Sequence, residues 1–325
     1  MHWQLTVLMG TFPILAMAQA STPSAQFPIT VPVWAYPVSK PPPPLGEVPD
    51  AQVAQRVPGS TVEYSKAQLR NLYQAPDWRP DGHSPMPAIV VGGRNPGVFA
   101  CGYCHLPTGT GRPENANLTG LSASYITQQL ADFKSGARKS SVAAMLPQAL
   151  MIRNAKNATD AEVESAARYF ASLPVRSLVT VVETDTVPRT EPRGWMLMPV
   201  EAGGSEPIGQ RIIEVPSDVR LVELRDPAIG FTSYVPRGSL EKGRQLSADT
   251  SRGPACVSCH GNDFKGVADI PRLAGRSPSY LMRQLTDFAS GVRNGTLGAA
   301  MVETAKRLSE AEMIALAAFA SSLPP

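Results

Sequence analysis

The chain has 325 residues, of which 18% are charged and 6% are aromatic, and it contains 32 prolines. A chain of this length accommodates two modest domains, and so many prolines indicate fixed turns and extended connectors. The formal net charge is +3, without a basic run or an arginine stripe. This composition argues against nucleic acid as a partner.

The first segment has the pattern of an export signal. Residues 5–18 are apolar but too few to cross a bilayer comfortably, and small residues recur at Ala16, Ala18 and Ala20. We therefore predict a signal peptide over residues 1–20, which implies a periplasmic protein. Because the residues before the apolar stretch include no Lys or Arg, an uncleaved anchor with peripheral membrane association is the alternative.

The segment that follows is rich in proline. Residues 21–56 are expected to form extended, polyproline-like chain without a core of its own. Trp34 and Tyr36 are the side chains in this segment that can pin it to a neighbouring domain. A loosely attached tail is the alternative.

The rest of the chain contains an internal duplication, in which residues 57–175 recur in diverged form as residues 235–325. Each copy has an early helical pattern, a Cys-x-x-Cys-His motif, an amphipathic helix stopped by glycine, and a helix that starts with a capping box. The matching segments are Tyr64–Leu72 and Leu240–Leu246, Ser124–Phe133 and Ser279–Phe288, and Thr159–Glu162 and Ser309–Glu312. We therefore predict a mainly α protein with two tandem helical domains.

The two copies are separated by a segment of different character, residues 176–234. It contains β-rich runs at residues 178–182, 211–215 and 220–224, separated by Pro and Gly turns. We predict an ordered, β-containing bridging segment between the two helical domains.

The Cys-x-x-Cys-His motifs carry the chemistry. They are Cys101-Gly102-Tyr103-Cys104-His105 and Cys256-Val257-Ser258-Cys259-His260. Two thiols at this spacing reach the two vinyl groups of one haem, and the adjacent histidine then lies under the iron. A zinc site or redox dithiols would leave both histidines unexplained. We therefore predict two covalently attached haem c groups, held by the four cysteines, with His105 and His260 as iron ligands.

A methionine is the expected second axial ligand of each iron, because a thioether closes the site and raises the reduction potential. Met301 stands eight residues before the second capping box, and Met151 stands eight residues before the first. Met145 is the alternative to Met151, because Ala143-Ala144-Met145 matches Ala299-Ala300-Met301 and its distance from His105 is closer to that between His260 and Met301. We predict Met151 and Met301 as the ligands.

One further histidine lies outside the motifs and the leader. His83 is in an inserted loop, residues 74–100, that has no counterpart in the second copy. We expect it to face solvent, and ligation of the first iron is its alternative role.

The sequence resembles a known family, the class I cytochromes c, in the two-domain dihaem form (cytochrome c-four-like). The resemblance is carried by residues 256–261, 270–275 and 279–291 and by Met301. It implies the helical cytochrome fold, His/Met ligation and the role of an electron carrier in the bacterial periplasm. It also implies that the carbonyl of Pro271 accepts a hydrogen bond from His260, with Ala116 at the aligned position of the first copy.

The predicted function is electron transfer without catalytic residues. The expected donor is a periplasmic dehydrogenase or a membrane redox complex, and the expected acceptor is an oxidase or another cytochrome. One alternative is a fixed electron-transfer subunit of a dehydrogenase or oxidase. A dihaem peroxidase-type enzyme is the other, and it would need an iron with a displaceable ligand.

Overall fold

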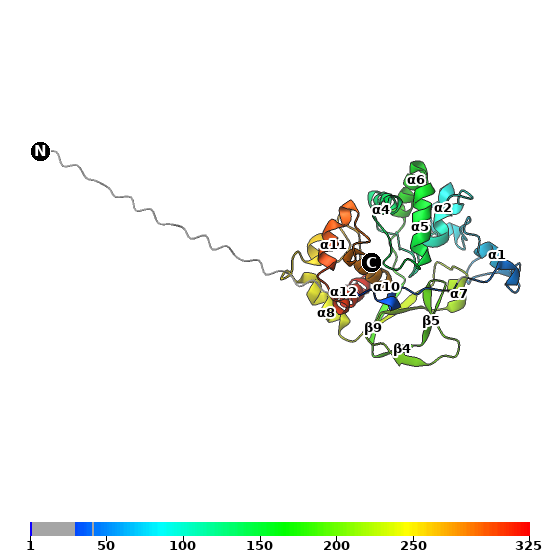
Figure 1. Ribbon diagram of the computed structural model, residues 1–325. Helices are drawn as coiled ribbons and strands as arrows, with labels where there is room; N and C mark the ends of the chain where they lie inside the picture. Colours follow the sequence, from blue (N-terminus) through cyan, green and yellow to red (C-terminus); the bar gives the residue numbers. More distant parts are fainter. Residues whose placement is uncertain (2–29, 41) are drawn as a thin grey trace.

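The computed structural model describes residue 1 and residues 30–40 and 42–325, so that the predicted signal peptide, apart from Met1, lies outside the described residues. Two helical domains lie side by side, and the strands of the bridging segment lie beneath them in the view of Figure 1. Within the described ranges, no helix has the length and apolar character needed to cross a membrane.

The first domain is built mainly from three long helices, α4, α5 and α6. The N-terminal segment contributes η1 (Val33–Ala35), η2 (Leu45–Glu47) and β1 (Ala54–Gln55). The elements of the first domain are β2 (Tyr64–Ser65), α1 (Lys66–Leu69), η3 (Pro80–Gly82), α2 (Ala88–Val91), α3 (Cys101–His105), α4 (Ala123–Ser135), α5 (Leu146–Asn157) and α6 (Asp160–Ser172). Helix α4 ends at Gly136 with φ +83°, a left-handed conformation that glycine adopts without steric cost. The capping box of Thr159 and Glu162 starts α6, which confirms that prediction.

The early helix of this domain is shorter than its sequence pattern predicts. Only α1, Lys66–Leu69, is helical, because Tyr64 pairs with Gln55 in the β1–β2 hairpin. Ser65 then caps the helix, and the side chain of Gln68 bonds back to the Ser65 backbone. The strand pairing therefore removes the first two residues of the expected helix.

The second domain repeats the arrangement in a more compact form. Its elements are α8 (Ser239–Ala248), α9 (Cys256–His260), α10 (Pro278–Ala289), η4 (Thr296–Gly298), α11 (Ala299–Ala305) and α12 (Glu310–Ser322). Helix α12 starts at the predicted capping box of Ser309 and Glu312. It packs closely on α8 at Gly243, where a Cβ atom would collide with the carbonyl of Ala315. Small residues on both helices therefore permit this close contact.

The bridging segment forms a small β unit with apolar clusters of its own. Its elements are β3 (Val179–Thr184), β4 (Thr186–Pro188), β5 (Thr190–Arg193), β6 (Met196–Pro199), β7 (Ser205–Pro207), β8 (Ile213–Pro216), α7 (Val219–Glu223) and β9 (Phe231–Pro236). Strand β9 lies between β3, to which it is parallel, and β8, to which it is antiparallel. The prediction of a strand at residues 220–224 is wrong, because most of this run lies in helix α7. The side chain of Asp218 caps the helix by accepting a hydrogen bond from the backbone N–H of Leu221.

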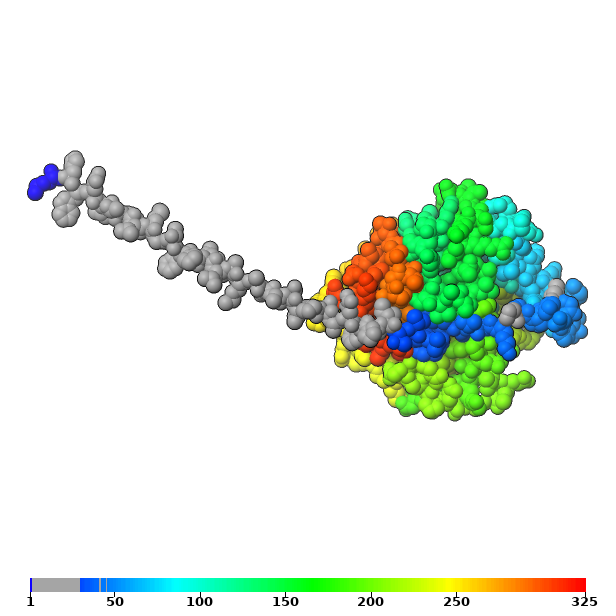
Figure 2. All heavy atoms as spheres, viewed as in Figure 1, coloured from blue at the N-terminus to red at the C-terminus, as the bar shows by residue number. Residues whose placement is uncertain are grey.

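The N-terminal segment crosses one face of the molecule, as the blue atoms of Figure 2 show. The Tyr36 hydroxyl donates a hydrogen bond to Asp287 Oδ1 at 2.9 Å, and Trp34 Nε1 donates one to Glu310 Oε1 at 2.9 Å. Asp287 and Glu310 belong to helices of the second domain. Trp34 and Tyr36 thus attach the N-terminal segment to the second domain, although the first domain is the next one in the sequence.

Candidate functional site

Helix α3 carries Cys101, Cys104 and His105 and is packed tightly into the first domain. A Cβ atom at Gly102 would lie 2.8 Å from the carbonyl oxygen of Val90 and 3.0 Å from the Cβ of Ala75. Glycine at this position lets α3 approach the inserted loop, and that contact fixes the direction in which the two cysteines and the histidine point.

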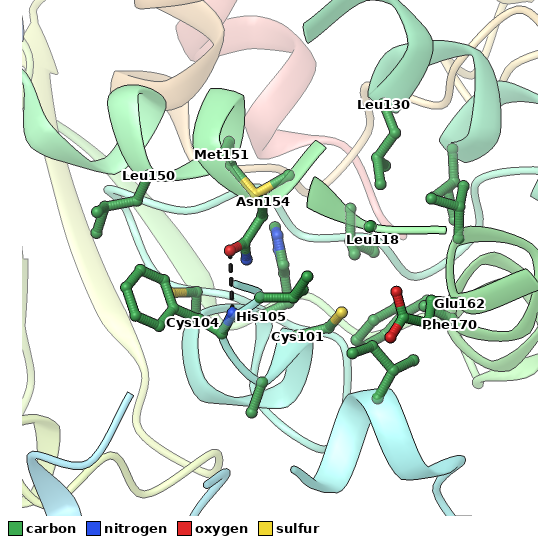
Figure 3. A pocket seen from close by; sticks show the side chains of 18 of the residues that line it. Cys101, Cys104, His105, Leu118, Leu130, Leu150, Met151, Asn154, Glu162 and Phe170 are labelled. Carbon is green, nitrogen blue, oxygen red and sulfur yellow. Dashed lines mark hydrogen bonds between the residues drawn. The ribbon is translucent and has the colours of Figure 1, made fainter. Parts of the chain in front are cut away.

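A cavity of about 730 Å³, including its open mouth, lies beside α3. Cys101, Cys104, His105 and Met151 all line it, and most of the remaining lining is apolar. Figure 3 shows Met151 projecting from α5 on one side of this space and the two cysteines on the other. The donor set and the apolar lining both fit a haem attached to the two thiols.

Both motif histidines are fixed by a main-chain carbonyl. His105 Nδ1 lies 2.9 Å from the carbonyl oxygen of Ala116, and His260 Nδ1 lies 2.9 Å from that of Pro271. This confirms the expected role of Pro271, and Ala116 supplies the equivalent carbonyl in the first domain. Burial lowers the pKa of both imidazoles. Each ring is therefore neutral at neutral pH and keeps Nε2 for a metal, as iron-binding histidines do.

The cysteines lie in surroundings that disfavour thiolates. Burial raises the pKa of the Cys101 thiol to about 12 and also raises the pKa of Cys104 and Cys256. A zinc site or a reactive dithiol needs thiolate sulfur at neutral pH. No cluster of three or more His, Cys, Asp or Glu side chains suited to a metal occurs in the described part of the chain. The chemistry of the thiols fits thioether formation better than metal binding.

The second domain presents its motif on helix α9. Cys256 lines a cavity of about 440 Å³ with Leu246 of α8 and Leu316 of α12. Met301 of α11 packs against the same apolar cluster as Cys256. Cys259, His260 and Met301 do not line this cavity, so the structure places Met301 with Cys256 only through that shared cluster.

Met145 and Met151 lie in different places. Met151 lines the first cavity, whereas Met145 is 1% exposed and belongs to the apolar core that includes residues of the second domain such as Met282 and Leu281. This placement supports Met151 over Met145 as the first-domain ligand.

The structure does not place His83 in solvent, contrary to the sequence-based expectation. Its ring contacts Asp77 Oδ1 at 3.2 Å, the carbonyl of Ser84 at 2.9 Å and the hydroxyl of Tyr169 at 3.2 Å. These bonds hold it as a structural link between the inserted loop and α6.

Asn154 and Glu162 also line the first cavity, and neither was predicted as a site residue. Asn154 Oδ1 accepts a hydrogen bond from the backbone N–H of Phe99 at 3.0 Å, drawn in Figure 3. Glu162 also lines it and is bound to Arg94, with 2.9 Å between Oε1 and Nε. Asn154 lies one helical turn after Met151, so helical spacing was a usable signal. Glu162 carried no such signal beyond its capping role.

The interaction between Glu162 and Arg94 can be tested through the pH dependence of stability. The hydrogen bond with Arg94 lowers the pKa of Glu162 from 4.5 to about 2. The unfolded chain therefore binds a proton at higher pH than the folded one, so stability present above about pH 4.5 is lost as the pH falls toward 2. We expect Glu162→Gln to lower the free energy of unfolding by up to about 1 kcal/mol at pH 7, with the deficit vanishing toward pH 2 in urea titrations.

Glutamine at position 162 still completes the capping box, so this variant isolates the charge. The matched control is Glu164→Gln, which removes an exposed helix pair with Arg168 and should cost less than about 0.5 kcal/mol. A deficit of Glu162→Gln that persists unchanged at pH 2 would contradict the charge argument.

Two helical domains, each with an attachment helix whose histidine is fixed by a carbonyl, define the class of the protein: a dihaem c-type cytochrome. The family model "Cytochrome c" matches residues 240–324. The chain is 40% identical over 68 residues to cytochrome c-554(548) of Halomonas halodenitrificans, covering 82% of that protein and 21% of this chain. The chain belongs to the cytochrome c family.

Two other relatives extend the comparison. Cytochrome c-552 of Acidithiobacillus ferridurans is 46% identical over 70 residues, which is 22% of this chain and only 29% of that protein. The thiosulfate dehydrogenase electron acceptor of Stutzerimonas stutzeri is 26% identical over 231 residues, 70% of this chain and 81% of that protein. The protein is thus an electron-transfer protein with covalently bound haem c. Bound haem supplies a reversible one-electron iron couple.

Proposed function

We propose that this protein is a periplasmic electron carrier whose two haems are attached at Cys101/Cys104 and Cys256/Cys259. Its proposed axial ligands are His105 with Met151 and His260 with Met301. The observation that carries the proposal is the first cavity, where Cys101, Cys104, His105 and Met151 line one apolar space. Cys101, Cys104, His105 and Met151 would hold the first haem, and with methionine as a ligand it would supply reversible electron transfer.

The proposed donor is a dehydrogenase, and an inorganic sulfur compound is its proposed substrate class. Support comes from the names of relatives, a thiosulfate dehydrogenase electron acceptor and a cytochrome subunit of sulfide dehydrogenase. The second name also supports the alternative of a fixed subunit. Purification from the native host distinguishes the two: a monomer that elutes alone supports the carrier, and a stable complex with a dehydrogenase supports the subunit.

The proposal predicts two porphyrins per chain. Mass spectrometry of the exported protein should show two added porphyrin masses, and the double variant Cys101→Ser/Cys104→Ser should lose one of them. The oxidised wild type should show methionine-to-iron charge transfer from both haems. A high-spin ferric signal would instead favour the peroxidase-type enzyme, and absence of porphyrin mass would overturn the proposal.

A further inference from the structure

The two attachment segments differ sharply in exposure. The duplication aligns each residue of the first segment with the residue 155 positions later, as His105 aligns with His260. Residues 105–111 are all buried, whereas in residues 260–266 only His260 and Phe264 are buried. The next four positions, 267–270, are all exposed. The same part of the fold is therefore covered in the first domain and open in the second.

The helices themselves show the same contrast. Gly102 and Tyr103 are buried, whereas their counterparts Val257 and Ser258 are half-buried and exposed, and Cys259 is exposed as well. The outer side of α3 is therefore inside the protein, while the outer side of α9 is on the surface.

Helix α1 and the inserted loop cover the first segment, and the inserted loop has no equivalent in the second domain. The Tyr103 hydroxyl donates a hydrogen bond to the carbonyl of Leu69 in α1 at 3.2 Å. The inserted loop packs on Gly102 through Val90. Leu69 lies 34 positions before Tyr103 in the sequence, so this cover is a tertiary feature.

The bridging segment completes the cover. Arg225 Nη1 donates to the carbonyl of Tyr103 at 2.7 Å, and its guanidinium lies 3.7 Å from the centre of the Tyr103 ring. Arg112 Nη1 donates to the carbonyl of Val222 at 3.2 Å. Arg225 has φ +61°, a conformation that a non-glycine residue keeps only when its surroundings hold it. The bridging segment is thus fixed over the first attachment helix.

From this asymmetry we infer that partner proteins exchange electrons with the second domain, at the face formed by α9 and residues 261–270, and that the first haem is reached only through the second. The inference rests on the proposed function, because it needs both haems. It gives the protein one docking face and a capacity of two electrons.

The chemistry of the open face indicates the kind of partner. Residues 257–270 carry Asp263, Asp269 and Lys265, so their formal charge is only −1, and Asp269 accepts hydrogen bonds from serines of the first domain. Val267 is 59% exposed and Ile270 is 38% exposed. The face therefore fits a redox protein with an apolar, weakly charged surface around its own centre, bound through a small transient contact.

The test compares a charge placed on the open face with the same charge placed on the cover. Val267→Asp is the test variant, and Val91→Asp, at an apolar residue of the inserted loop that is 39% exposed, is the matched control. The probe is a reduced blue-copper protein, mixed with the oxidised holoprotein in a stopped-flow spectrometer. We expect Val267→Asp to lower the second-order rate constant at least about fivefold, and this slowing should apply to the absorbance changes of both haems. We expect Val91→Asp to change the rate constant less than twofold.

Two results would overturn the inference. If half of the absorbance change of Val267→Asp kept the wild-type rate, partner proteins would reduce the first haem directly, at a separate docking site. If Val91→Asp slowed the reaction equally, the cover would itself be a docking surface.

Further measurements separate this inference from the proposed function and from self-association. Ascorbate, which needs no docking face, should reduce both variants at the wild-type rate, and each variant should carry two porphyrin masses. Missing porphyrin would count against the proposed function alone. If sedimentation velocity showed that Val267→Asp dissociates a dimer without slowing the copper-protein reaction, the face would be an interface between two copies of this chain, and the inference would be wrong.

Discussion

Replacement of Met151 by alanine should remove methionine ligation from the first haem and leave the second unchanged. Met151 lines the cavity that also contains His105 and both cysteines of the first motif. Without the thioether, the first haem should lose its charge-transfer band, so that about half of the band of the whole protein remains, and its reduction potential should fall because methionine ligation raises it. Optical spectra and a redox titration of the purified holoprotein measure both effects.

Met145→Ala is the matched control, since it removes the same side chain from the apolar core. Met145 is 1% exposed and makes no part of the cavity wall around His105. We expect this variant to keep the full band but to lower the free energy of unfolding by about 2–5 kcal/mol, the usual cost of truncating a buried methionine. The reverse pattern, with the band halved in Met145→Ala and intact in Met151→Ala, would make Met145 the ligand.

The sequence was sufficient for the features that depend on local chemistry. The two motifs, the capping boxes at Thr159 and Ser309 and the glycine at the end of α4 follow from residue types at fixed spacings. Pro271 was expected to accept a hydrogen bond from His260 because of a family resemblance, and the structure contains that bond. Each of these features involves residues close together in the chain.

Features that depend on contacts between distant residues were not predictable in this way. His83 was expected in solvent, but Tyr169, 86 positions later, holds its ring. The run at residues 220–224 has the composition of a strand, yet the cap at Asp218 makes it a helix. The cover over Tyr103 depends on Arg225, 122 positions away. A sequence pattern specifies none of these partners, so only the tertiary structure reveals them.

The interface between the two domains is built around two buried arginines at matching positions of the duplication. Arg138 and Arg293 are 8% and 7% exposed. Their side-chain hydrogen bonds run from Arg138 to Gln129 Oε1 (2.9 Å), Tyr280 Oη (3.0 Å) and Gln284 Oε1 (2.9 Å), and from Arg293 to Gln284 Oε1 (2.9 Å), Tyr125 Oη (2.9 Å) and Gln129 Oε1 (2.9 Å). Each arginine thus bonds to its own domain and to the other.

These bonds make the two arginines dependent on each other. Each glutamine oxygen accepts from both guanidinium groups, and no carboxylate lies within 4.0 Å of either group among the described residues. Removing one arginine leaves buried acceptors with fewer donors, and such a loss typically costs about 1–3 kcal/mol. Burial lowers the pKa of His105 and the charge of Arg138 lowers it further, so this charge also reaches the first haem site.

We expect Arg138→Met and Arg293→Met each to lower the free energy of unfolding of the holoprotein by about 1–3 kcal/mol in urea titrations. Arg138→Met should also lower the reduction potential of the first haem, because a nearby positive charge disfavours the oxidised, more positive iron. The control Arg168→Met removes an exposed pair with Glu164 and should stay within about 0.5 kcal/mol.

The double variant Arg138→Met/Arg293→Met distinguishes one shared interface from two separate ones. Because the two arginines share the acceptors Gln129 and Gln284, the combined loss should differ from the sum of the single losses by about 0.5–3 kcal/mol. An additive loss would mean that each arginine stabilises only its own domain. We do not expect the two losses of unfolding free energy to add, because each guanidinium group needs acceptors from both domains to complete its hydrogen bonds.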